Sequence, residues 1–139
     1  MTAMIRLALL AVILAACGGD SSDPAGGGSI NGMIDDGTGA VPFTDDCEFF
    51  STDNYVHVAT TSDQTGVEVI WDPVIVDEPG AYTTSGIVPD ITIAALVKGE
   101  ITGAEGSVTF TVIDASHVVG SLELSGTRIT GTASFDCTR

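Results

Sequence analysis

Basic side chains are scarce in this chain of 139 residues. Four Lys and Arg residues stand against 19 Asp and Glu residues, which gives a formal net charge of -15 with both histidines neutral. A protein that binds nucleic acid through its phosphates needs a surface of Lys and Arg side chains. The charge balance therefore excludes nucleic acid as a partner.

Histidines and catalytic motifs are also few. The sequence contains no Gly-x-Ser-x-Gly motif, no His-Glu-x-x-His motif, no glycine-rich phosphate loop and no EF-hand spacing. His57 lies within an alternating segment and His117 lies beside a turn, so we expect both side chains at the rim or in solvent. The sequence predicts a protein that is not an enzyme and that carries no cofactor.

Beyond the first residues, the chain lacks long apolar runs. Residues 1–6 carry one positive charge and no acid, and Leu7 to Leu14 are all apolar. This run is far shorter than the roughly 20 residues that a bilayer-spanning helix needs. The pattern predicts an export signal peptide over residues 1–16.

The end of this apolar run resembles the lipobox of bacterial lipoproteins, in the residues Leu14-Ala15-Ala16-Cys17. The resemblance implies cleavage before Cys17 and acylation of that cysteine, with chains such as palmitate. Several acyl chains hold a protein on a membrane, because each buried CH₂ contributes about 0.8 kcal/mol and one chain anchors only marginally. The expected partner is thus a membrane of the bacterial cell envelope. Gly18, in place of an aspartate, implies the outer membrane.

The next residues predict a spacer. Residues 18–29, GGDSSDPAGGGS, include no large apolar side chain and cannot bury surface. We therefore expect a flexible tether over residues 17–29 and a folded domain over residues 30–139.

Cysteine is rare, with three in the chain. Acylation of Cys17 leaves Cys47 and Cys137, and an even pair in an exported protein predicts a disulfide. The acids beside both cysteines disfavour a reactive thiolate, and two cysteines with two distant histidines match no zinc spacing.

The sequence pattern of the domain predicts an all-β fold. Gly, Pro, Asp and Ser clusters interrupt segments rich in Val, Ile and Thr about every eight to twelve residues. This predicts an antiparallel sandwich or partly closed barrel of about eight strands, ending in a meander. The clearest strands are expected over 55–60, 67–72, 81–84, 91–97, 107–112, 120–124 and 129–137.

Alternation predicts which side chains face the core. Trp71 shares a face with Val67 and Val69, which leaves Glu68 and Asp72 facing water. In the meander the inward rows are expected to be Val108, Phe110 and Val112, then Leu122 and Leu124, then Ile129, Ala133, Phe135 and Cys137. The glycines that recur in these strands, Gly120 and Gly131, are typical of a bulge or bend.

Several segments resemble the small, functionally uncharacterised β domains common in bacterial lipoproteins. They are Pro79-Gly80-Ala81-Tyr82, Val119-Gly120-Ser121-Leu122, residues 106–111 (GSVTFT) and residues 129–135 (ITGTASF). The resemblance implies an all-β fold and carries no catalytic residue.

Two kinds of ligand stay open. Acidic residues in expected loops could hold Ca²⁺ through oxygen ligands, although solvated surface charge explains them more simply: Asp35, Asp36, Asp45, Asp46, Asp77 and Glu78. A carbohydrate platform needs exposed aromatics, for which Trp71, Tyr55 and Tyr82 are available. The leading hypothesis is a lipid-anchored envelope domain with a structural or binding role through its loops, toward an envelope protein or glycan. The alternative is a carbohydrate- or Ca²⁺-binding module.

Overall fold

The domain is built from one continuous antiparallel sheet. The computed structural model describes residues 27–139, in which ten strands join edge to edge in the order β5-β8-β9-β10-β1-β2-β3-β4-β6-β7. The expected signal peptide and the lipobox with Cys17 lie outside the described residues. Between residues 27 and 139 there is no helix with the length and hydropathy needed to cross a membrane.

The strands follow one another with short connections. They are β1 (Gly28–Asp35), β2 (Ala40–Ser51), β3 (Val56–Thr60), β4 (Thr65–Trp71), β5 (Gly80–Thr83), β6 (Ile91–Val97), β7 (Glu100–Ala104), β8 (Gly106–Ile113), β9 (His117–Ser125) and β10 (Thr130–Thr138).

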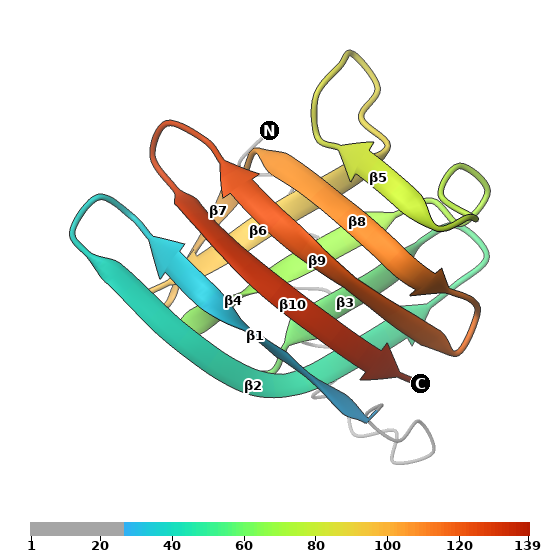
Figure 1. Cartoon of the computed structure of the whole chain (residues 1–139), viewed down its shortest axis with the longest axis horizontal. Helices are drawn as coiled ribbons and strands as arrows, with labels where there is room; N and C mark the ends of the chain where they lie inside the picture. The colour runs from blue at the N-terminus through green and yellow to red at the C-terminus, as the bar shows by residue number, and fades with distance from the viewer. Residues whose placement is uncertain (1–26) are drawn as a thin grey trace.

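Strand β2 turns the sheet into two layers. Its first part, residues 40–46, pairs with β1, and its second part, residues 47–51, pairs with β3. Figure 1 shows β2 curving from the layer that holds β1, β10, β9 and β8 to the layer that holds β3, β4 and β6. A strand that changes partners in this way makes a corner between two packed sheets.

The apolar core fills the space between the layers. Trp71 from β4 packs edge-on against Phe110 from β8, with ring centroids 5.0 Å apart, and Phe110 also contacts Phe135 from β10 at 5.8 Å. These rings are between 1% and 3% exposed. The prediction that Trp71 is a core residue is thereby confirmed.

The sequence-based expectation of an antiparallel all-β fold with a C-terminal meander is confirmed. Segment 91–97, the one segment whose pattern could also suit a helix, is strand β6. The sheet has ten strands where the sequence predicts about eight, because β1, β2 and β7 lack the strict alternation that marks the others.

One inward position was predicted wrongly. Val112 is 37% exposed, because the pairing of β8 with β9 slips between Phe110 and Val112, opposite Gly120. A bulge adds one residue to one strand, so the alternation changes phase there and Ile113 packs against the core instead. A Cβ on Gly120 would meet the carbonyl oxygen of Thr109 and lie 2.8 Å from Cζ of Phe135, so the bulge requires glycine.

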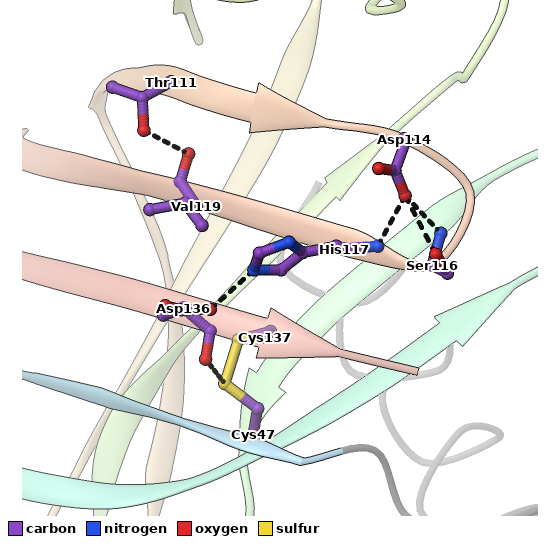
Figure 2. Close-up of polar contacts among 8 residues, drawn as sticks. All are labelled: Cys47, Thr111, Asp114, Ser116, His117, Val119, Asp136 and Cys137. Atoms are coloured by element: carbon purple, nitrogen blue, oxygen red, sulfur yellow. Dashed lines mark hydrogen bonds and ion pairs between the residues drawn. A yellow bond between two sulfur atoms is a disulfide. The ribbon is translucent and has the colours of Figure 1, made fainter.

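A disulfide joins the corner of the sheet to its last strand. Cys47 lies where β2 changes partners, Cys137 lies in β10, and their sulfur atoms are bonded across 90 residues of sequence (Figure 2). Both residues are at most 1% exposed. The predicted pairing and the inward position of Cys137 both agree with the structure.

We predict that the disulfide stabilises the domain by restricting the unfolded chain. Replacing both cysteines, Cys47→Ala with Cys137→Ala, should lower the free energy of unfolding by about 4 to 5 kcal/mol, the loop-closure value for about 90 residues. Urea denaturation with and without reductant measures this difference. Reductant should destabilise the natural chain and leave the double variant unchanged; equal stability of oxidised and reduced protein would contradict the prediction.

Candidate functional site

A cavity of about 330 Å³ lies beside the second layer, over β3, β4 and β6. Glu48 of β2 and Ile101 of β7 border it, and the loop between β3 and β4 contributes its rim. Its lining includes Glu48, His57, Ala59, Asp63, Glu68, Ala94, Leu96 and Ile101.

The strand register explains how these residues meet. Ala59 lies directly opposite Glu48 on one neighbouring strand and opposite Glu68 on the other, and Glu68 lies opposite Ala94. Residues directly opposite one another share a face of the sheet. Because Cys47, Val58 and Val67 point into the core, this row of acidic and small residues lies on the outer face.

A buried histidine and a buried glutamate form the polar centre of the cavity. His57 is 1% exposed and Glu68 is 5% exposed. His57 Nε2 lies 3.0 Å from Glu68 Oε1, but the contact lacks hydrogen-bond alignment, so this oxygen has no hydrogen-bond partner. Nδ1 of His57 also has none within residues 27–139. Both side chains therefore carry a buried polar atom without a hydrogen-bond partner, and both atoms are shielded from solvent.

The expectations that His57 and Glu68 face solvent were wrong. Alternation correctly assigned both to the face opposite Val58 and Val67, but it does not show what flanks them. His57 lies between Phe50 and Ile70 of the neighbouring strands, and these wide side chains shield its ring.

The polar part of the cavity lining contains three acids, three hydroxyl side chains and one histidine. Glu68 is buried, Glu48 is partly buried and Asp63 stands exposed at the rim. No Lys or Arg of the described chain lines the cavity. The cavity therefore offers hydrogen-bond acceptors and negative charge, with the His57 ring as its one basic group.

The rest of the cavity wall is apolar and is formed partly by small side chains. Ala59 and Ala94 have small side chains that leave room above the sheet, and Leu96 and Ile101 are only partly buried. Leu96 of β6 lies directly opposite Ile101 of β7. Small residues next to larger apolar ones form a trough suited to an apolar ligand body.

The predicted acidic loop residues do not gather into a metal centre. Within residues 27–139, no three His, Cys, Asp or Glu side chains lie close enough to hold one metal ion. Asp35 and Asp36 lie at the β1–β2 turn and Asp77 and Glu78 lie between β4 and β5.

Asp45 and Asp46 were expected in a loop but lie within strand β2, so that expectation was wrong. When a strand carries acidic residues and changes partners along its length, its sequence pattern is hard to distinguish from that of a loop. Asp45 Oδ1 accepts a hydrogen bond from the hydroxyl of Thr61 at 2.9 Å.

Local hydrogen bonds explain the acidic turn residues at the β1–β2 connection. Asp35 Oδ1 accepts from the amide of Gly37 at 2.8 Å. Hydrogen bonds from the hydroxyl and amide of Thr38, assisted by Lys98, lower the pKa of Asp36 below its ordinary 3.8. Lys98 Nζ lies 3.7 Å from Asp36 Oδ2 and so links this turn to the β6–β7 turn.

The three aromatic candidates for a carbohydrate platform have different environments in the domain. Trp71 is 3% exposed and belongs to the core. Tyr82 is partly buried and donates its hydroxyl hydrogen to the carbonyl of Glu78 at 2.8 Å. Tyr55 packs against Phe50 with ring centroids 6.1 Å apart. In the described domain these three do not form one exposed aromatic surface.

The second histidine belongs to a surface corner near the disulfide. Nε2 of His117 lies 2.8 Å from Oδ1 of Asp136 (Figure 2). Their side chains are 38% and 65% exposed, which agrees with the expected rim position of His117. The backbone carbonyl oxygen of Asp136 lies 3.6 Å from Cys47 Sγ, in a contact without a hydrogen because the sulfur belongs to the disulfide.

The turn before His117 is held by Asp114. Hydrogen bonds from the amide of Ser116, then from its hydroxyl, lower the pKa of Asp114 below its ordinary 3.8. The two distances are 2.8 and 3.1 Å, and the amide of His117 donates to the same oxygen at 2.8 Å.

Comparison with known protein families, with curated proteins and with solved structures finds no match for this chain.

Sequence reasoning missed the His57–Glu68 pair. The two residues lie on neighbouring strands in a diagonal relation that depends on the register of β3 against β4. A histidine and a glutamate in phase on two consecutive predicted strands are the signal that could have indicated it.

We predict that the Asp114 turn loosens in acid. Because the folded pKa lies below 3.8, the stabilising contribution of the carboxylate is complete above that pH and is lost as the pH falls through the folded pKa. A carbon-13 NMR titration of Asp114 should therefore give a midpoint below 3.8. Ser116→Ala removes only the hydroxyl bond and should move the midpoint partly back; a midpoint at 3.8 or above in the natural chain would contradict this account.

Proposed function

We propose that this chain is a lipid-anchored protein of the bacterial cell envelope whose β domain binds a small ligand in the cavity on its outer face. One observation carries the binding role: a cavity of about 330 Å³ on the outer face combines apolar side chains with the buried His57–Glu68 pair.

The size and shape of the cavity support the same role. Ligand pockets range upward from about 300 Å³ and combine apolar walls with a few placed polar groups. This cavity of about 330 Å³ joins the Ala94 and Leu96 wall to the His57–Glu68 centre. The binding role therefore belongs to the face of a sheet rather than to loops.

The hydroxyl groups of the lining support a non-enzymatic role. Thr60 Oγ1 accepts a hydrogen bond from the amide of Val67 at 3.1 Å and lies 3.4 Å from its carbonyl oxygen. Thr61 Oγ1 donates to Asp45, and Ser62 Oγ accepts from Gln64. A nucleophilic hydroxyl is commonly activated by an adjacent histidine, and in residues 27–139 none of these three hydroxyls is hydrogen-bonded to His57, the basic ring of the lining.

The anchoring role rests on the sequence. The Leu14-Ala15-Ala16-Cys17 motif and the polar tether that follows it would hold the domain near a membrane surface. The excess of acids over bases keeps the domain away from anionic headgroups. The cavity would then face the aqueous space of the envelope.

A glycan-binding role is the second candidate, and one observation favours it. A second depression of about 330 Å³, with a largely polar lining, lies over β8, β9, β10 and β1. Thr109, Ser121, Ser134 and Asn31 lie directly opposite one another on these four strands. Hydroxyl and amide side chains of this kind can bond to the hydroxyls of a sugar.

We predict that acylation of Cys17 attaches the protein to membranes. The variant Cys17→Ser should incorporate no labelled fatty acid and should leave the membrane fraction, because its other polar segments do not partition into lipid. Fractionation of cells after metabolic labelling measures both effects. Thr2→Ser, a substitution near the start of the signal peptide, is the control and should remain acylated. Continued labelling of Cys17→Ser would show that the lipoprotein assignment is wrong.

We predict that small amphiphiles bind in the outer-face cavity. In NMR titrations with hexan-1-ol, hexylammonium and hexanoate, at least one probe should shift the amides of Ala59, Glu68 and Leu96 in a saturable way. Ala94→Leu fills the trough and should remove these shifts, while Ala115→Leu in an exposed turn should not.

The same measurement separates the two candidate functions. The absence of cavity shifts with all three probes would contradict the binding role. Saturable shifts of Thr109, Ser121 and Ser134 with N-acetylglucosamine or glucose would favour the glycan role instead.

A further inference from the structure

Two large apolar side chains stand in solvent side by side in the β4–β5 connection, residues 72–79. Val74 is 79% exposed and Ile75 is 49% exposed. Single apolar residues scattered over a surface are normal, whereas adjoining ones form a patch that a partner can cover.

The local structure of the connection holds this apolar pair outward. Oδ1 of Asp72 accepts the amide hydrogen of Val74 at 2.8 Å. The carbonyl oxygen of Asp72 accepts the amide hydrogens of Ile75 and Val76 at 3.1 and 3.0 Å. Val76 is 1% exposed and belongs to the core. Because the turn is hydrogen-bonded and Val76 is packed below it, Val74 and Ile75 cannot turn into the core without breaking these contacts.

The connection lies at the end of the domain where the chain enters β1. Gly80, which follows the connection, shares one cross-strand row with Ile30 of β1. Thr83 and Met33 share a second row, so β5 and β1 run in the same direction. Figure 1 shows the start of β1 and the β4–β5 connection at the same end of the domain, opposite the β1–β2 and β9–β10 turns.

The distance from this end to the expected anchor at Cys17 is short. Strands β5 and β1 are four strand spacings apart in the sheet, which is about 19 Å. Ten residues, 18–27, separate Cys17 from β1, and a chain of this length spans at most about 33 to 36 Å. A membrane that holds an acylated Cys17 can therefore also touch the β4–β5 connection. Such a contact forms within one anchored molecule, so even a weak apolar contact becomes populated.

The charge of the connection selects the kind of lipid. Asp77 and Glu78 follow the apolar pair and are exposed. Anionic headgroups would repel these carboxylates. Zwitterionic headgroups such as phosphatidylcholine carry no net charge and present a cationic ammonium group. The surface that suits this end of the domain is thus a zwitterionic bilayer.

We propose that Val74 and Ile75 contact the zwitterionic bilayer that holds the acylated Cys17, and that this contact orients the domain on the membrane. The proposal rests on the proposed lipid anchor and adds an interaction surface to it. The rim of the outer-face cavity comes from the loop before β4, whereas the apolar pair comes from the connection after β4. The membrane contact and the cavity therefore lie at opposite ends of that strand.

The test uses the full acylated chain, purified from the membrane fraction and transferred to bicelles of phosphatidylcholine. Some of the lipid headgroups carry a spin label, which broadens the NMR signals of nearby amides. Mass spectrometry of the same sample measures the acyl chains on Cys17. The amides of Val74 and Ile75 report the proposed contact, and those of Gly37 and Lys98 report the opposite end of the domain.

We expect the amide signals of Val74 and Ile75 to be lost to broadening while those of Gly37 and Lys98 remain. Partial replacement of the phosphatidylcholine by phosphatidylglycerol should restore the lost signals, because the anionic headgroups repel Asp77 and Glu78.

The variant Val74→Ser with Ile75→Ser removes the apolar contact and leaves the buried Val76 in place. It should abolish the selective broadening of residues 74 and 75 without removing the protein from the bicelles. The matched control is Met33→Ser with Val41→Ser, which removes two apolar side chains that are 46% and 37% exposed on β1 and β2. This control should keep the broadening.

The outcomes separate the contact from the anchor. Acylated protein with evenly broadened signals would overturn the contact and leave the anchor intact, whereas a chain without acyl groups would reject both. Equal effects of the two double variants, or stronger broadening with phosphatidylglycerol, would also overturn the contact. Shifts of Val74 and Ile75 that depend on protein concentration without lipid would assign the pair to a second copy of the chain instead.

Discussion

The change of partners within β2 is the constraint on which the rest of this domain depends. Because residues 40–46 pair with β1 and residues 47–51 pair with β3, one strand belongs to both layers, and a single sheet encloses its own core. The disulfide of Cys47 holds this corner to β10. The aromatic contacts of Trp71 and Phe110 across the core depend on the same closure, since they come from opposite layers.

The same corner creates the candidate site. Continuing β2 past Cys47 aligns Glu48 with Ala59 of β3, and the next strand adds Glu68 to that row. The second layer is thus apolar toward the core and holds a small set of buried polar groups on its other face. The first layer differs, because its outer face carries Ser, Thr and Asn side chains that remain in contact with solvent. The two outer faces therefore differ in the ligands that we propose for them, a small amphiphile on the second layer and a polar polymer on the first.

The acidic residues have one effect on the chain as a whole and another in individual turns and at the cavity. Across the whole chain, the excess of 19 acids over four bases disfavours anionic partners such as nucleic acid. In several turns the acids have local structural roles, as Asp35 and Asp114 show by accepting amide hydrogens. Within residues 27–139, Glu48, Asp63 and Glu68 line the cavity that also includes the buried His57. We propose that this combination of charge and burial serves ligand binding.

Alternating residues made the fold class, the meander and the burial of Trp71 and Phe135 predictable, because a period of two follows from strand geometry alone. The pairing of Cys47 with Cys137 was predictable once the lipobox resemblance assigned Cys17 to acylation and left an even pair. The change in alternation at Val112 was not predictable, because it depends on a slipped register opposite Gly120. The candidate site was not predictable either, because alternation assigns His57 and Glu68 to a face of the sheet without showing which residues lie beside them. Those neighbours come from strands whose order along the sheet is a long-range property, and long-range pairing brought a histidine, two glutamates and an apolar wall together.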